Sequence, residues 1–157
     1  MKTSGQIRTH RESGAADALS SASDVLSAGL AMGIFPEGTR SRRDEAPFLS
    51  EGKTGVARLA AAHPHAVVVP LALVGTREVM QPQHHKFPRL WRRFNVHAAR
   101  GVTWLTWLAS EKGGNQTPSS LLELSKSDEH EIRAELSRLY RQFTDQLMGT
   151  LAASGAP

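Results

Sequence analysis

The chain has 157 residues, of which 39% are hydrophobic and 22% are charged, and this length and composition predict a single soluble globular domain. It contains no cysteine, which excludes disulfide bonds, thiolate nucleophiles and cysteine-ligated zinc sites. Its formal charge of +4 and isoelectric point near 10.0 favour anionic partners such as phosphate, a membrane surface or nucleic acid.

The first part of the chain predicts a helix, a strand and a second helix. Residues 14–28 place apolar side chains at helical spacing, and Gly29 is a natural stop after them. Residues 30–35 are a short apolar run, which predicts a strand buried on both faces. Residues 54–62 have a second helical pattern, which residues 63–65 end with a proline between two histidines.

A continuous apolar run follows the second helix. Residues 66–74 are rich in β-branched side chains, as is typical of a central parallel strand. Pro70 removes one ladder donor and therefore predicts an edge, a bulge or a strand end. Strand, helix and strand with short connections form a βαβ pattern, in which ligands bind beyond the carboxyl ends of parallel strands. We therefore expect a binding loop directly after residue 35.

The next part of the chain is less regular. Residues 81–93 are a polar and basic linker, and residues 94–108 predict one or two further strands. Trp104 and Trp107 lie three positions apart in this segment, and we interpret them as core residues or a hydrophobic lip. Residues 111–118 are rich in glycine and polar side chains, which predicts a loop.

The last predicted element is a long amphipathic helix. Residues 128–151 carry their apolar side chains on one stripe, and Ser127 or Asp128 is placed to cap the start. Together the elements predict an α/β fold with one domain over residues 1–151. Residues 152–157 are expected to be a disordered tail.

The turn after residue 35 has the chemistry of an anion site. Gly38 lets a ligand approach the backbone, Thr39 offers a hydroxyl donor, and Arg40 supplies a planar fork for two phosphate oxygens. Glu37 repels phosphate, so its better role is to hold a hydroxyl or to orient an arginine. The alternative interpretation is a Pro-Gly turn followed by a solvated run of charges.

Four segments carry a family resemblance. Residues 35–41 read Phe-Pro-Glu-Gly-Thr-Arg-Ser, which resembles the third signature block of the glycerolipid acyltransferases, a family that includes 1-acylglycerol-3-phosphate acyltransferase. Residues 68–71 are similar to the fourth block, residues 52–58 fit the segment between, and residues 5–11 resemble the second block. The resemblance implies a partial acyltransferase-like sheet with flanking helices and a long C-terminal helix.

The resemblance also implies a function in phospholipid biosynthesis. A fatty acyl group would pass from acyl-CoA or acyl carrier protein, as co-substrate, to a lysophosphatidate or glycerol-phosphate acceptor, with no further cofactor. Five residues are implied to bind the phosphorylated glycerol lipid acceptor: Glu37, Gly38, Thr39, Arg40 and, as a second phosphate contact, Arg11.

One block of the family is missing. Family members carry a histidine followed five positions later by an aspartate, where the histidine is the general base and the aspartate orients it. Of the seven histidines here, only His130 has an acidic residue at that distance, Glu135, and this spacing on a helix is poor for a hydrogen-bonded pair. We therefore assign no catalytic residue and expect an N-terminally truncated member that holds the acceptor site. The alternative is a noncatalytic remnant that binds anionic phospholipid.

The segment 84–93 interleaves cations with Phe and Trp, which suits an anionic membrane surface. Single-stranded nucleic acid or plain solvent fits the same pattern, but lipid substrates favour the membrane, so no nucleic-acid partner is expected. The start of the chain has no signal-peptide core, and no window approaches the ~18 apolar residues that span a bilayer. We expect a cytoplasmic protein peripheral to the membrane. His84 and His85 are adjacent and diverge, so no metal is expected.

Overall fold

The computed structural model describes residues 14–39, 45–81 and 87–157. The predicted mixed α/β class and the long C-terminal helix are confirmed. The elements are, in chain order, α1 (Gly14–Ser27), α2 (Gly55–Ala62), β1 (Val67–Val68), β2 (Leu71–Val74), α3 (Thr76–Val79), β3 (Asn95–Ala98), β4 (Val102–Thr103), α4 (Trp104–Ala109), α5 (Pro118–Leu124) and α6 (Glu129–Ala153).

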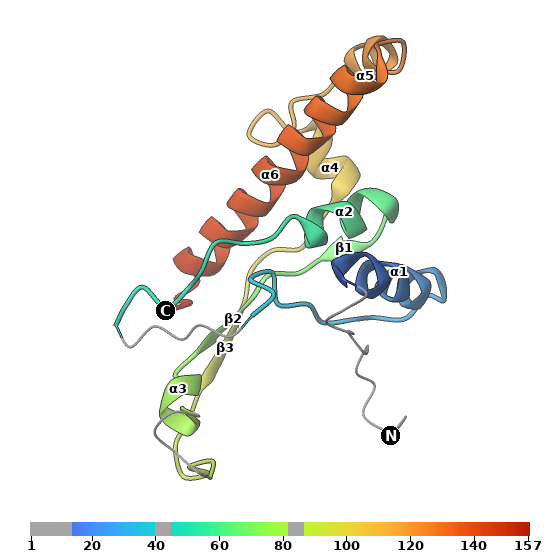
Figure 1. The fold of residues 1–157 in the computed structure, drawn as a ribbon. Helices are drawn as coiled ribbons and strands as arrows, with labels where there is room; N and C mark the ends of the chain where they lie inside the picture. The colour runs from blue at the N-terminus through green and yellow to red at the C-terminus, as the bar shows by residue number, and fades with distance from the viewer. Residues whose placement is uncertain (1–13, 40–44, 82–86) are drawn as a thin grey trace.

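Helix α6 forms the long axis of the molecule (Figure 1). Helix α5 lies beside its N-terminal end, and α2 and α4 lie along its middle. The β2–β3 pair extends from the opposite end as a narrow ribbon, with α3 at its far tip. Helix α1 packs beside α2, away from α6.

Three predicted helices are present with nearly the expected bounds. Helix α1 ends one residue before the predicted boundary, and α2 begins one residue after it. The carboxylate of Asp128 accepts a hydrogen bond from the amide of Glu131 over 2.8 Å, which caps the start of α6 as expected. In these segments helical periodicity and cap residues agree, so local pattern sufficed to place them.

The main core is an aromatic cluster where α2, α4 and α6 meet. Trp104 and Trp107 are each only 6% exposed, and the Trp107 ring stands edge-on to Phe143 with centroids 5.0 Å apart. The indole nitrogen of Trp107 donates to the side-chain oxygen of Gln146 over 2.7 Å, so its burial leaves no unmet donor. Leu139 and Ala57 complete the contact from α6 and α2. The expectation that both tryptophans are core residues is confirmed.

The sheet differs from the prediction in pairing and continuity. No parallel pair occurs among the described residues: β1 pairs antiparallel with β4, and β2 pairs antiparallel with β3. The single strand expected over residues 66–74 is divided at Val69 and Pro70. Because proline has no N–H to donate, the ladder breaks at Pro70, where the sequence predicted an edge, a bulge or a strand end. The predicted βαβ unit is therefore wrong for this part of the chain.

A bulge lies beside Pro70. Val68 pairs with Val102 and Leu71 pairs with Ala98, so two residues on one strand face three on the other. The amide of Ala99 still donates to the carbonyl of Pro70 over 3.0 Å, which keeps the two ladders joined. Residues 66–74 and 95–103 thus form one long bent hairpin with an extra residue at its middle.

Two further expectations need correction. Residues 30–35 were predicted to be a strand, but they are irregular in the structure, and an apolar run without a pairing neighbour gains nothing from an extended backbone. Within 94–108 two strands occur, but the segment from Trp104 onward is helix α4. Thr103 and Thr106 form a capping box that starts this helix.

The chain end is placed against the ribbon and the loop before α2. Residues 152–157 were expected to be a disordered tail; in the structure α6 continues to Ala153, and the carbonyl of Pro157 accepts from the amide of Leu49 over 2.6 Å. Ala156 packs on a small second cluster of Ala72, Met148 and Leu151. These contacts join the C-terminus to β2.

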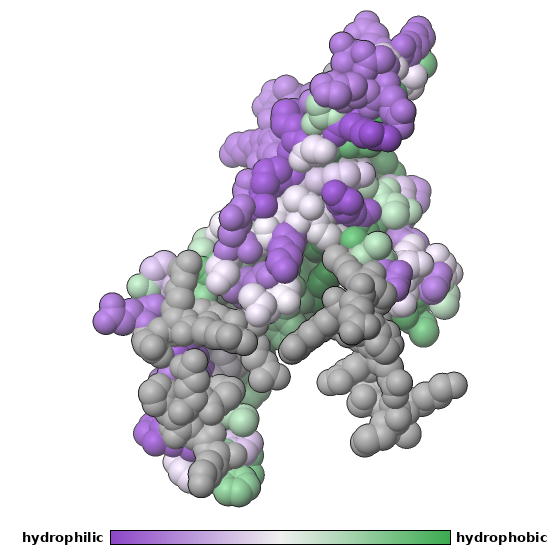
Figure 2. All heavy atoms as spheres, viewed as in Figure 1, coloured by the Kyte–Doolittle hydropathy of each residue, from purple (hydrophilic) through white to green (hydrophobic). Residues whose placement is uncertain are grey.

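The described residues leave one face of the long hairpin exposed, here called the bare hairpin face. Ala72 and Val74 face α6 and the chain end, whereas Leu71 and its cross-strand neighbour Ala98 lie on the opposite face. Leu71 is 54% exposed and Val96, on the same face, is 52% exposed. Hydrophilic residues cover the α5 end of the molecule, whereas both kinds lie side by side at the lower tip (Figure 2).

Candidate functional site

The predicted anion turn follows the irregular segment 30–35. The amide of Gly38 donates to the carbonyl of Phe35 over 3.0 Å, which closes the turn. Gly38 has a φ of 68°, a left-handed conformation that glycine adopts without the steric cost of a Cβ. Thr39, the next residue, is exposed. A tight turn with an open backbone is therefore present at the expected position.

Two hydrogen bonds brace this turn against residues 50–53. The backbone amide of Ser50 donates to Oε2 of Glu37 over 2.7 Å, and the amide of Lys53 donates to the carbonyl of Pro36 over 2.8 Å. Among the described residues Glu37 accepts a hydrogen bond from this backbone amide, and our expectation that it holds a hydroxyl or orients an arginine stays a prediction. Glu37 is half-buried and orients the turn.

Lys53 lies against the turn; it belongs to the 52–58 segment of the family resemblance, and we assigned it no ligand role from the sequence. A Cβ placed on Gly38 would be 3.0 Å from Cδ and 3.3 Å from Nζ of Lys53. The lysine ammonium therefore lies beside the glycine of the turn. Helix α2 begins two residues later, at Gly55, and its N-terminus adds partial positive charge. A cation just before a helix start was the available signal for this residue.

Helix α6 supports the strand-like segment that carries Lys53. Gly52 is buried, and a Cβ there would lie 2.7 Å from Cγ of Met148 and 2.8 Å from Cγ2 of Thr144. Arg141 of α6 donates from Nη1 to the carbonyl of Gly52 over 2.8 Å and to Oε1 of Glu51 over 3.2 Å. Only glycine fits here, so the position of Lys53 depends on the C-terminal helix.

Two predicted phosphate ligands lie outside the described residues. These are Arg11 and Arg40, so the structure brings together Glu37, Gly38 and Thr39 of the predicted set and adds Lys53. The turn also lies outside any parallel sheet, because residues 30–35 form no strand and the described pairs are antiparallel. The expectation of a site at the carboxyl ends of parallel strands is therefore wrong, while the turn itself stands.

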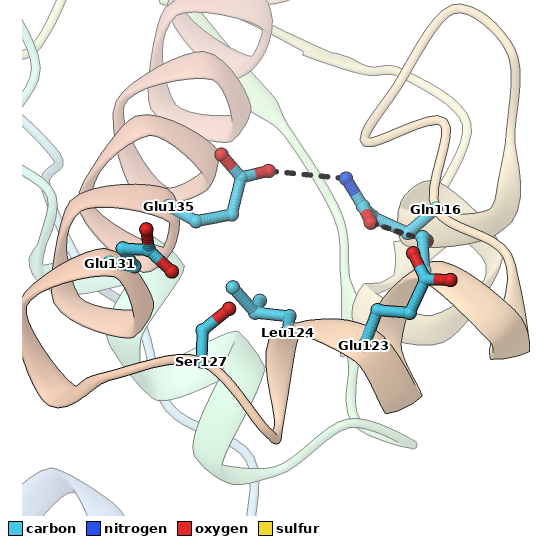
Figure 3. Close-up of a pocket in the computed structure, with 7 residues that line it drawn as sticks. Gln116, Glu123, Leu124, Ser127, Glu131 and Glu135 are labelled. Carbon is cyan, nitrogen blue, oxygen red and sulfur yellow. Dashed lines mark hydrogen bonds between the residues drawn. The ribbon is translucent and has the colours of Figure 1, made fainter.

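A hollow of about 360 Å³ lies between α5 and α6, far from the turn (Figure 3). Its wall carries Glu123, Glu131 and Glu135, and Gln116 donates to Oε1 of Glu135 over 3.2 Å. Arg138 donates two hydrogen bonds to Glu135, which lower the pKa of that carboxyl although partial burial opposes the shift. An acidic wall repels phosphate, so this hollow does not suit the predicted acceptor.

A second hollow of about 490 Å³ lies where the ends of α1 and α2 meet. It is lined mostly by apolar atoms, with Leu26 and Leu30 on one side and residues 62–66 on the other. Ser23 and Nε2 of His63 are hydrogen-bonded over 2.8 Å, which pins α1 to the end of α2. His63 is thereby engaged in joining two helices.

Metal ligands and membrane spans were sought over the same ranges. Within residues 14–39, 45–81 and 87–157, no group of three or more His, Asp or Glu side chains is placed to hold a metal ion. Among the helices of those ranges, none combines the length and the apolar composition that crossing a bilayer requires.

Comparison with known proteins agrees with the chemistry of the turn. The family model described as Acyltransferase matches residues 1–74, which include the 36–39 turn, Lys53 and strands β1 and β2. Residues 1–74, called the acyltransferase segment below, are similar to this family. The match covers just under half of the chain and supports an acyltransferase-like function in lipid metabolism. Searches of curated proteins and of solved structures find no match.

The acyltransferase segment does not form a separate unit. Its 50–53 brace rests on Arg141, Thr144 and Met148, which all lie in α6 and outside the matched residues. Strands β1 and β2 pair with β4 and β3, which also follow the segment. The site is therefore built by the acyltransferase segment and held in place by the rest of the chain.

Proposed function

We propose that this chain holds the acceptor site of an acyltransferase that moves a fatty acyl group from acyl-CoA or acyl carrier protein to lysophosphatidate or glycerol phosphate. The acceptor phosphate lies at the 36–39 turn. Lys53 and Arg40 neutralise its charge, Thr39 donates from its hydroxyl, Gly38 lets the ligand come close to the backbone, and Arg11 adds a further cation.

One observation carries this proposal. The turn is braced by the Ser50 amide on Glu37 and by the Lys53 amide on Pro36, and this bracing sets the lysine side chain against Gly38. A preorganised cation beside an open glycine suits a phosphate, because little ordering remains to be done on binding. The acyltransferase-family match over the same residues supports the choice of acceptor chemistry.

The proposed transfer breaks the C–S bond of the thioester and forms a C–O ester bond. The acceptor hydroxyl attacks the carbonyl carbon, its proton passes to a base, and the carrier leaves as a thiol after protonation. The described histidines include His63, bonded to Ser23, and His97, bonded to the carbonyl of Ser154. We assign neither as the base, and the proposal covers the acceptor half of the reaction.

A second candidate is a noncatalytic protein that binds anionic phospholipid through the same turn. The observation that favours it is that no histidine in the chain is followed five positions later by aspartate. Both candidates require the phosphate contacts at residues 36–39 and at Lys53. They differ only in turnover.

Phosphate binding is tested by calorimetric titration of glycerol 3-phosphate into the full chain. Lys53→Ala and Arg40→Ala are each expected to weaken binding about tenfold or more, because each removes a charge-assisted contact. Lys126→Ala and Arg133→Gln are matched controls, since both residues are exposed and lie on the α5–α6 side. Unchanged affinity in Lys53→Ala, or an equal loss in the controls, contradicts the proposal.

Turnover decides between the two candidates. Purified chain is incubated with lysophosphatidate and radiolabelled acyl-CoA, and the lipid product is separated and counted. Label in phosphatidate that disappears in Arg40→Ala supports an acyltransferase. Binding of glycerol 3-phosphate without any labelled product supports the noncatalytic candidate. If neither glycerol 3-phosphate binding nor labelled product is detected, the proposed acceptor site is wrong.

A further inference from the structure

The tip of the hairpin, residues 87–94, is a built turn with large apolar side chains at its apex. The amide of Arg92 donates to the carbonyl of Arg89 over 3.0 Å, so Leu90 and Trp91 take the two central positions. They are 86% and 78% exposed. The amide of Arg89 also donates to the carbonyl of Val79 over 2.8 Å, which ties the turn to α3.

This composition is unusual for a turn in water. Central turn positions favour Gly, Pro, Asn, Asp and Ser, whose backbone or side-chain chemistry suits a tight bend. Single exposed apolar residues are common, but here Phe87 is 80% exposed and Phe94 is 50% exposed beside the apex pair. Four large apolar side chains therefore meet the solvent at one end of the molecule.

Positive charge surrounds these side chains. Arg89 and Arg92 flank the apex, Arg93 follows, and Arg77 lies in α3. Arg77 stacks on the ring of Phe48, with 3.8 Å between guanidinium carbon and ring centroid. Within α3 and residues 87–94 the one acidic residue is Glu78. The tip thus joins apolar side chains to an excess of cations.

We propose that the 87–94 tip docks on an anionic lipid surface. Leu90 and Trp91 enter the boundary between headgroups and acyl chains, while the arginines meet lipid phosphates. The tip lies at the far end of the ribbon from α6 (Figure 1), so it reaches a bilayer without any change in the core. Mixed hydrophobic and hydrophilic character at this end is visible in Figure 2.

The bare hairpin face continues the apolar surface inward from the tip. Phe94, Val96 and Ala98 alternate along β3 and its flank, and all point to the face opposite α6. Leu71 lies across from Ala98 on the same face. A membrane-docked tip would bring this face near the bilayer surface, where exposed apolar area costs less than in bulk water.

Two other partners fit the tip less well. A single-stranded nucleic acid stacks on aromatic faces and contacts phosphates, but the most exposed residue of the tip is Leu90, which has no π face. A second copy of the chain would place arginines against arginines, which repel each other. Of these three partners, only an anionic lipid surface contacts both the aliphatic side chain of Leu90 and the arginines favourably.

Vesicle binding of the full chain tests the proposal. Vesicles of pure phosphatidylcholine are compared with vesicles of phosphatidylcholine and phosphatidylglycerol in equal parts, by co-sedimentation. Binding is expected to favour the anionic vesicles and to fall as salt rises, because screening weakens the arginine contacts. The tryptophan fluorescence emission of the chain should also shift to shorter wavelength when it binds the vesicles. Trp104 and Trp107 are buried, so the shift reports on Trp91.

Paired variants separate the apolar and charged contributions. Leu90→Ser with Trp91→Ser is expected to lower vesicle affinity at least about tenfold, and Arg92→Gln with Arg93→Gln about fivefold for each arginine. The matched controls are Leu121→Ser with Leu122→Ser, exposed on α5, and Arg133→Gln on α6. The controls should bind as the parent does, and circular dichroism checks that every variant folds.

Three results from the vesicle experiments and their controls overturn the proposal, and a fourth comes from the protein alone. The three are no binding to anionic vesicles, equal loss in the control pairs, or binding to a single-stranded oligonucleotide with no lipid preference. Shielding of Trp91 that grows with protein concentration in the absence of vesicles would also contradict it, because that result indicates self-association. Titration with soluble glycerol 3-phosphate reports on the acceptor turn separately, so either proposal can fail while the other stands.

Discussion

The helical end of the molecule and the hairpin end treat apolar side chains in opposite ways. Leu139 in α6 is 1% exposed inside the aromatic cluster, whereas Leu71 in β2 is 54% exposed on the bare hairpin face. Both are leucines in regular structure. Leu139 stabilises the fold because its side chain leaves water on folding, whereas Leu71 keeps much of its apolar area in contact with water, where another surface can bind it.

This contrast assigns different roles to the two ends. Helix α6 supports the 36–39 turn through the contacts of Arg141 and its neighbours with Gly52, and this support needs dense packing. The hairpin ends in the 87–94 tip, where exposed apolar area is a cost to the isolated chain and a gain for a docked one. Stability and surface contact are thus separated in space.

The largest expected effect is on stability, and it tests the contrast between the helical end and the hairpin end. Leu139→Ala should lower the free energy of unfolding by about 2–5 kcal/mol, because it removes contacts and leaves a cavity in the aromatic cluster. Leu71→Ala should change it by less than about 0.5 kcal/mol, since that side chain is already in water. Urea unfolding measures both. Similar losses would mean that the hairpin face is covered in solution.

The next effect sharpens the role of α6 as the support of the turn. Gly52→Ala places a methyl group 2.7 Å from Met148 and should cost about 1–3 kcal/mol of unfolding free energy. Gly33→Ala is the matched control, because nothing lies within 4 Å of its Cβ position. That change should be neutral or stabilise by up to about 1 kcal/mol. A neutral Gly52→Ala variant would contradict the described contact with α6.

Two variants of Glu37 separate its role in bracing the turn from its effect on ligand binding. Glu37→Ala removes the acceptor for the Ser50 amide and should cost about 1 kcal/mol of unfolding free energy and weaken glycerol 3-phosphate binding. Glu37→Gln keeps an acceptor oxygen and removes a negative charge, so phosphate binding should hold or tighten a few-fold. Calorimetry compares the two variants. If Glu37→Gln weakens binding as much as Glu37→Ala, the carboxylate itself contacts the ligand.

The smallest effect concerns the acidic hollow at α5 and α6. Hydrogen bonds from Arg138 hold the pKa of Glu135 below its usual value, so the pair stabilises the fold above about pH 4.5 and this gain is lost as pH falls further. Arg138 is exposed and Glu135 is half-buried, so solvent screens the pair and it is worth less than about 1 kcal/mol. Wild type and Glu135→Gln, unfolded in urea at about pH 6 and about pH 3, should differ only at the higher pH. A larger difference in unfolding free energy at about pH 3 than at about pH 6 would contradict the lowered pKa of Glu135.

Local signals in the sequence were enough for part of the fold. Helices α1, α2 and α6 followed from apolar periodicity, Gly29 and the Asp128 cap, all of which act within a few residues. Helix α5 was missed although Thr117 and Ser120 form a capping box ahead of it and Pro118 begins it. The same capping signal, at Thr103 and Thr106, was available for α4.

Non-local facts could not be read from the sequence. Whether β1 and β2 pair in parallel depends on which segment arrives beside them, and the chain returns antiparallel through β3 and β4. The string at residues 35–41 pointed to the turn, but that Lys53 lies beside Gly38 could not be read from the sequence. Motifs locate a loop, while folding decides which distant cation stands next to it.

The salt link of Arg141 reaches across the boundary at which family similarity stops. A guanidinium from the last helix grips the carbonyl of Gly52, eighty-nine positions earlier in the chain. The last helix therefore helps to position a segment that the family match covers, although the helix itself lies outside that match. Replacing this helix with one of different side chains would shift residues 50–53 and the 36–39 turn that they brace, with every signature residue left untouched.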